Sequence, residues 1–168
     1  DSPDLQRILD LPRRAPVDLD DSPRARALVT LMTNRLRREN TNCECATLGR
    51  RCILELKPAQ AWALYEAPLA GGLFGIIGAG HGKTILDILI AMVMPNTKQA
   101  VLLVPPGLVL QLEREYEAVS QHFRVPSLIL DDARGNIIPG RPVLHVLPYS
   151  RLSRPESTEW LERHLKPQ

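Results

Sequence analysis

The stretch GHGKT, residues 80–84, is the strongest indication of fold class in this sequence. An apolar, glycine-containing run precedes it, and an apolar run with helical spacing follows it. We therefore predict a strand over residues 73–77, a glycine-rich loop, and a helix over residues 84–93. Glycine has no Cβ, so the backbone N–H groups of such a loop can approach an anion closely. The N-terminus of the helix adds unsatisfied donors and the positive end of its dipole.

This arrangement is typical of a phosphate-binding loop (P-loop, Walker A). The Lys83 ammonium would reach the β- and γ-phosphates of a nucleotide, and the Thr84 hydroxyl would ligate Mg²⁺. The remaining candidate phosphate contacts come from the loop itself, namely Gly78, Ala79, Gly80, His81 and Gly82. The alternative is a glycine-rich turn that carries Lys-Thr by coincidence, and the flanking apolar pattern disfavours it.

Composition limits the chain to one domain, or one lobe with an appendage. It has 168 residues, of which 44% are hydrophobic and only 4% aromatic, so we expect a core of aliphatic side chains. The net charge of +2 does not by itself indicate a polyanionic partner. No apolar run reaches membrane-spanning length, and the N-terminal residues lack a secretory pattern. With three cysteines, an odd number, a reducing cytoplasm is expected.

Strand and helix signals alternate from about residue 56 onward. The expected strands are 73–77, 100–104, 127–130 and 143–147, and the expected helices are 84–93, 108–120 and 156–165. Apolar strands interleaved with helices indicate an α/β fold with a mostly parallel sheet covered on both faces, and ligands bind at the carboxyl ends of such strands. We therefore expect residues 56–168 to form a nucleotide-binding lobe, and residues 1–55 to form a partly helical extension.

In the extension we expect one short helix over residues 5–9 and a longer one over residues 24–38. Ser22 can cap the second helix and Pro23 fits its first position. The arginines between 24 and 51 could touch nucleic acid, although a solvated helix face is the favoured interpretation.

Three cysteines, Cys43, Cys45 and Cys52, form a small cluster in the sequence. They could ligate zinc or an iron–sulfur centre, or they could be reduced thiols. A closed zinc site needs four ligands, and the nearest histidine along the chain is His81. The sequence leaves metal binding open and favours the thiols.

The motifs around the loop resemble those of superfamily 2 helicases and Swi/Snf-like ATPases, including helicase-like proteins of bacteriophages and their hosts. The segment LKPAQ, residues 56–60, is similar to the glutamine motif of that family. The resemblance implies that Gln60 hydrogen-bonds the adenine edge of ATP, because an amide offers a donor and an acceptor side by side. Without the family pattern, Gln60 would be interpreted as a surface residue at a helix start. The shared pattern also implies a RecA-like lobe, ATP and Mg²⁺ as cofactors, and the cytoplasm of a bacterial or phage-infected host cell.

Two further segments resemble the DNA-contacting motifs of the same family. Residues 104–115 match a motif in which a strand ends in Val-Pro, and the implied backbone contacts fall on Gly107 and Leu108. Residues 145–152 match a strand that ends in Thr-Tyr-Ser, with Pro148 in place of the threonine. There the implied contacts are Tyr149 and Ser150. The resemblance therefore implies duplex DNA as a partner, held by its phosphates, and a second RecA-like lobe.

An ATPase of this family also needs an acidic motif on a later strand, which holds Mg²⁺ and polarises the attacking water. We expect this chain to be a fragment that ends before that motif, and therefore to hydrolyse little ATP alone. Two alternatives remain open. One is a stand-alone P-loop kinase or small NTPase that uses Asp131 and Asp132 for magnesium, although these residues also suit a strand end and turn. The other is a non-catalytic nucleic-acid-binding module with the segment 24–51 as its binding face.

Overall fold

The computed structural model describes residues 6, 22–39, 43, 52, 54–73, 75, 77, 80–130, 134–154 and 156–165. Its helices are α2 (Pro23–Leu36), α3 (Pro58–Ala70), α4 (Lys83–Val93), α5 (Val109–Ser120) and α6 (Glu156–Leu165). Its strands are β1 (Gln99–Val104), β2 (Ser127–Leu130), β3 (Arg134–Asn136) and β4 (Val143–Pro148). Two short 3-10 helices, η2 (Pro106–Leu108) and η3 (Tyr149–Ser153), follow β1 and β4. Among the described residues, no helix combines the length and apolar character needed to cross a bilayer.

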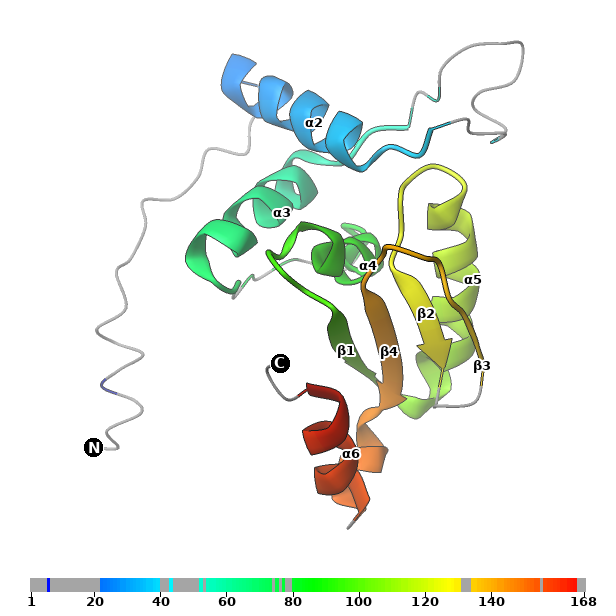
Figure 1. Ribbon diagram of the computed structural model, residues 1–168. Coiled ribbons are helices and arrows are strands. Elements are labelled where there is room, and N and C mark those ends of the chain that lie inside the picture. The colour runs from blue at the N-terminus through cyan, green and yellow to red at the C-terminus, as the bar shows by residue number, and fades with distance from the viewer. Residues whose placement is uncertain are drawn as a thin grey trace.

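The strands form a four-stranded sheet in the order β1-β4-β2-β3 (Figure 1). β4 pairs in parallel with both β1 and β2, while β3 pairs antiparallel with β2. The mostly parallel α/β sheet is therefore confirmed. The antiparallel strand β3 was not predicted, because its sequence Arg-Gly-Asn is polar and reads as a turn.

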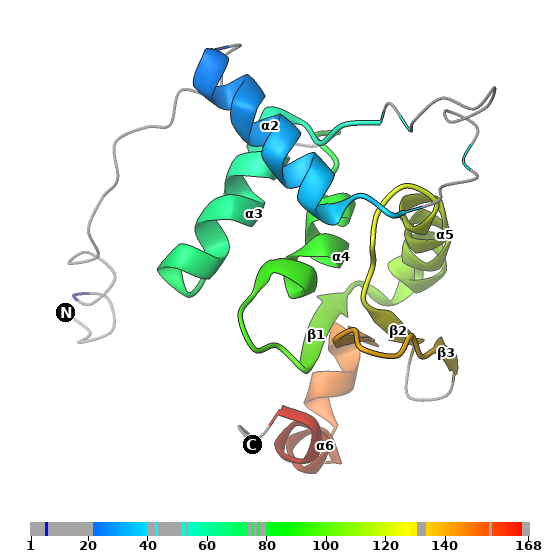
Figure 2. The same ribbon diagram turned by 45° about the horizontal axis from the view of Figure 1, so that its top comes forward.

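The two faces of the sheet carry different helices. Successive side chains of a strand point to opposite faces, and one set, which includes Val104, Leu144 and Val146, joins the main apolar core with α4 and α5. His145 points the other way and meets the Trp160 ring of α6 edge-on, with the ring centroids 5.3 Å apart. Figure 2 shows α6 on the opposite side of the sheet from α4 and α5.

Helix α2 shares this core instead of standing apart from it. Ser22 accepts a hydrogen bond from the N–H of Ala25 at 3.1 Å, so the predicted N-cap and Pro23 start are confirmed. The buried residues Met32 and Leu36 of α2 belong to the same apolar cluster as Leu64 of α3. The division of the chain at residue 55 stays a prediction, and the short helix over residues 5–9 lies outside the described residues, apart from Gln6.

The strand predicted immediately before the glycine loop is wrong. Residues 73, 75 and 77 have no strand pairing, and residues 74 and 76 lie outside the described part. A strand exists only through hydrogen bonds to a neighbour, and glycine weakens it because its backbone loses more entropy on ordering. With Gly71, Gly72 and Gly75 in or beside the run, apolar composition alone was an insufficient signal. Instead, α3 ends at Ala70 and the chain runs through the loop into α4.

Candidate functional site

The loop before α4 has the backbone geometry of an open helix N-terminus. Gly80 and Gly82 have φ values of 77° and 72°, in the left-handed region that favours glycine. Gly82 is the N-cap of α4, and no side chain caps the helix. The first N–H groups of α4 therefore lack a side-chain acceptor, which is the condition for binding an anion there.

Gln60 holds this loop in place from the first turn of α3. Its side chain is buried, and its Nε2 donates to the carbonyl oxygens of His81 at 3.2 Å and Gly82 at 2.9 Å. Its Oε1 accepts from the N–H of Lys57 at 2.8 Å. Both amide hydrogens of Gln60 are thus committed to the loop, and a Cβ added at Gly82 would overlap with the Nε2 of Gln60. The surface interpretation of Gln60 is wrong, because the residue lies at a helix start but is buried.

Two lysines place their ammonium groups on the same loop. The Nζ of Lys83 donates to the carbonyl oxygen of Ile77 at 3.2 Å, and the Nζ of Lys57 donates to that of Gly80 at 3.2 Å. Both side chains are exposed, so phosphate oxygens can replace these carbonyl acceptors without opening the core. Lys57 was not among the predicted site residues, and its sequence position before Pro58 gives no signal for this contact.

Asp87 lies one helical turn after Lys83 on α4. Partial burial raises the pKa of the Asp87 carboxyl above its ordinary value, and the positive charge of Lys83 opposes that rise. Thr84, the predicted Mg²⁺ ligand, is half-buried in the first turn of the same helix. Gly78 and Ala79, both predicted phosphate contacts, lie outside the described residues.

The four predicted DNA-contacting residues meet at one edge of the sheet. Gly107 and Leu108 belong to η2 after β1, and Tyr149 and Ser150 belong to η3 after β4. β1 and β4 are parallel neighbours, with Val104 paired to Pro148, so the two 3-10 helices leave the same carboxyl edge. All four residues are exposed.

Two arginines of the basic segment have structural roles. Arg37 donates to the carbonyl oxygen of Leu54 at 3.0 Å, and Arg38 donates to that of Ser120 at 3.0 Å. These bonds tie the end of α2 to distant parts of the chain. Charge reversal at Arg37 or Arg38 would therefore disturb the fold as well as any nucleic-acid contact.

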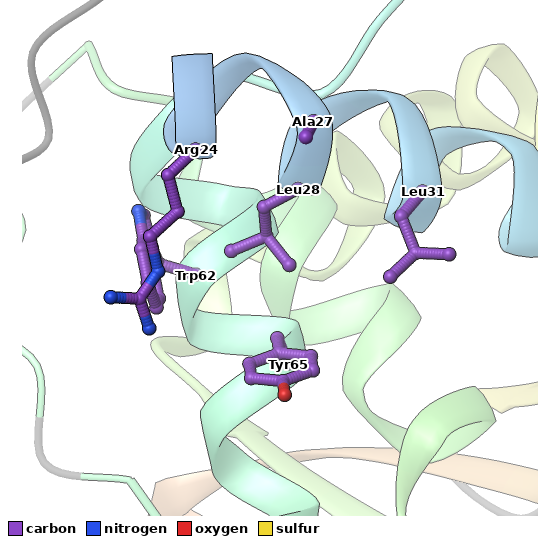
Figure 3. A pocket seen from close by; sticks show the side chains of 6 residues that line it. All are labelled: Arg24, Ala27, Leu28, Leu31, Trp62 and Tyr65. Atoms are coloured by element: carbon purple, nitrogen blue, oxygen red, sulfur yellow. The ribbon is translucent and has the colours of Figure 1, made fainter. Parts of the chain in front are cut away.

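A separate hollow of about 210 Å³ lies between α2 and α3 (Figure 3). Arg24 stacks over the Trp62 ring, 5.4 Å from its centroid, and Tyr65 meets Trp62 edge-on. Residues 60 and 62 are about 200° apart around a helix. The hollow thus lies on the other side of α3 from Gln60, and no residue of the glycine loop lines it.

Two cysteines of the extension lie beside a histidine, a contact that the sequence did not indicate. Cys43 and Cys52 are buried and reduced, and His122 completes a group of three side chains that could hold a metal ion. His122 lies 70 residues beyond Cys52, in the connection after α5, so no local spacing could reveal it. Cys45 lies outside the described residues, and Asp131 and Asp132 do as well.

The fold and the loop define an α/β protein with a lysine-bearing, glycine-rich helix N-terminus. A comparison with protein-family models, with curated proteins and with solved structures finds no match to the chain.

Proposed function

We propose that this chain is the ATP-binding lobe of a DNA-dependent ATPase of the helicase or translocase type. The observation that carries the proposal is the uncapped N-terminus of α4, entered through Gly80 and Gly82 and flanked by two lysine ammonium groups. Backbone donors, a helix dipole and exposed cationic side chains together suit a polyphosphate.

Each residue of the loop has a proposed role in this function. The backbone N–H groups of residues 78–82 and of the α4 N-terminus would bind phosphate oxygens, and Lys83 would neutralise the β- and γ-phosphates. Thr84 would hold Mg²⁺ through its hydroxyl. Gln60 was expected at the adenine edge, and its three hydrogen bonds instead support a first role as the residue that positions the loop. A paired donor–acceptor contact to adenine would need at least one of the two Nε2 bonds to be exchanged, because both amide hydrogens are in use.

The DNA partner is supported by the grouping of η2 and η3 at one sheet edge. Exposed backbone and hydroxyl donors there would bind DNA phosphates without reading sequence. ATP would be held between this lobe and a second RecA-like lobe, which would supply the remaining catalytic groups.

Replacing Lys83 by alanine tests the nucleotide site. We expect Lys83→Ala to weaken binding of ATP and ADP with Mg²⁺ by at least about tenfold, because a charge-assisted hydrogen bond to phosphate is worth about 1.5–3 kcal/mol. Titration calorimetry on the purified chain measures the affinity. Lys98→Ala is the matched control, since Lys98 is also an exposed lysine but directly precedes β1.

Unchanged affinity in Lys83→Ala, or an equal loss in Lys98→Ala, would contradict the proposal. If nucleotide binds as expected, the effect of DNA on ATP hydrolysis distinguishes a helicase-type ATPase from a metabolite kinase. Hydrolysis by this chain together with its second lobe should rise when duplex DNA is added, whereas a kinase for a small acceptor would ignore DNA.

A further inference from the structure

Cys43, Cys52 and His122 bring three metal-binding atoms together in the fold. The two sulfur atoms and one ring nitrogen all lie within 4.8 Å of one another, and the Sγ of Cys52 is 3.3 Å from the Nδ1 of His122. Both cysteines are buried and the histidine is half-buried. This cluster is separate from the phosphate loop, and nothing in the proposed ATPase function uses it.

The donor set and the distances suit a soft divalent cation. In a tetrahedral zinc site, Zn–S of about 2.3 Å and Zn–N of about 2.0–2.1 Å place the ligand atoms about 3.6–3.8 Å apart. The three ligand atoms lie within 4.8 Å of one another and the Cys52–His122 pair is 3.3 Å apart, so small rotations of the side chains would complete the geometry. Two thiolates and an imidazole favour Zn²⁺ over the hard Mg²⁺ expected with a nucleotide.

The backbone around His122 is anchored to the end of α2. The N–H of Arg38 donates to the carbonyl oxygen of His122 at 3.0 Å, and the N–H of Arg124 donates to that of Leu36 at 2.7 Å. Between them, Arg37 and Phe123 form an isolated antiparallel bridge, and Phe123 is fully buried. Figure 1 shows the connection after α5 beside the chain that leaves α2. The backbone of His122 is therefore held in position independently of any metal.

We infer that Cys43, Cys52 and His122 bind one Zn²⁺ ion as a structural site. The cysteines come from the chain between α2 and α3, and the histidine comes from the connection between α5 and β2. A metal here would join the N-terminal extension to the sheet-bearing part of the molecule. The fourth coordination position is completed by a ligand beyond these three residues, which in a site of this kind is a further side chain or water.

The metal content of the purified chain tests this inference. We expect about one Zn²⁺ per chain by elemental analysis, and a thiolate-to-cobalt charge-transfer band when Co²⁺ replaces Zn²⁺. Cys52→Ser and His122→Gln should each weaken Co²⁺ binding by more than about tenfold, since each removes a ligand. His164→Gln is the matched control, because α6 lies at the opposite end of the sheet from α2 in Figure 1.

A second measurement uses the unaltered chain, so it tests the inference even if the variants fail to fold. Removing the metal with a chelator should lower Tm by several degrees, and adding Zn²⁺ should restore it. The inference is overturned if the unaltered chain neither retains Zn²⁺ nor shows the cobalt band. It is also overturned if His122→Gln binds Co²⁺ as tightly as the unaltered chain, or if thiol labelling shows a disulfide between Cys43 and Cys52.

Discussion

Asp87 shows at the scale of one residue how burial and a nearby charge compete. The carboxyl is half-buried on α4, and this burial favours its protonated form. Lys83, one turn earlier, favours the ionised form but has the smaller effect. The pKa of Asp87 is therefore higher in the folded chain than in the unfolded chain, so ionising this group on the way to neutral pH costs stability.

Replacing Asp87 by asparagine should reveal that cost as a dependence on pH. The penalty is absent below the ordinary pKa of 3.8, grows as pH rises toward the raised pKa, and is complete above it. We expect Asp87→Asn to have a higher Tm than the unaltered chain at pH 7, and the gap to narrow as pH falls toward 4. Thermal unfolding at several pH values measures it. A lower Tm for Asp87→Asn at pH 7 would mean that the attraction to Lys83 dominates.

At the scale of elements, α3 sets the shape of a loop that follows it in the chain. The carbonyl oxygens of His81 and Gly82 both accept from Gln60, which lies in the first turn of α3. The loop therefore keeps its shape through a helix and needs no preceding strand. This explains how the N-terminus of α4 can be held open although residues 73, 75 and 77 are not in a strand.

Replacing Gln60 by glutamate should break this link while keeping the size of the side chain. The carboxylate still accepts from Lys57, but it faces the carbonyl oxygens of His81 and Gly82 without a proton to donate. We expect the free energy of unfolding to fall by about 1–3 kcal/mol, and ADP affinity to fall as the loop loosens. Urea denaturation and calorimetry measure the two effects. Gln99→Glu, at an exposed position, is the control, and equal stability of the two variants would refute the role of Gln60.

At the scale of the whole molecule, the candidate DNA-contacting residues lie apart from the arginines that stabilise the fold. Gly107, Leu108, Tyr149 and Ser150 are exposed where β1 and β4 end, whereas Arg37 and Arg38 are engaged in holding α2. In the proposed function, a DNA backbone would lie along the carboxyl edge of the sheet. The basic extension stabilises the molecule from another side.

DNA binding should depend on that edge and on salt. We expect the double variant Tyr149→Ala/Ser150→Ala to bind duplex DNA about fivefold more weakly, equally for two unrelated sequences, because phosphate contacts carry no sequence information. Binding should also weaken as salt rises. Fluorescence anisotropy measures both effects. Tyr65→Ala, another exposed tyrosine, should bind DNA like the unaltered chain, and an equal loss there would contradict the placement of DNA on this edge.

Local pattern was sufficient for the elements that have strong periodicity or caps. Helices α4 and α5, strands β1, β2 and β4, and the Ser22 cap all lie where apolar spacing and turn residues placed them. Strand β3 and the run before the loop were not predictable in this way. The polar strand β3 is recognised as a strand through its antiparallel pairing with β2. The apolar run over residues 73–77 lacks strand pairing at its described positions.

The fold class and the candidate phosphate loop could be predicted from local features, because helical periodicity, glycine residues and a lysine at a helix start can be recognised without knowing how the elements pack. The burial of Gln60 beneath that loop, and the grouping of His122 with Cys43 and Cys52, arise from packing between distant elements. Contacts between distant residues depend on how the elements pack. A hydrogen bond across 21 residues, or the contact between Cys52 and His122 across 70, produces no periodic pattern in the sequence.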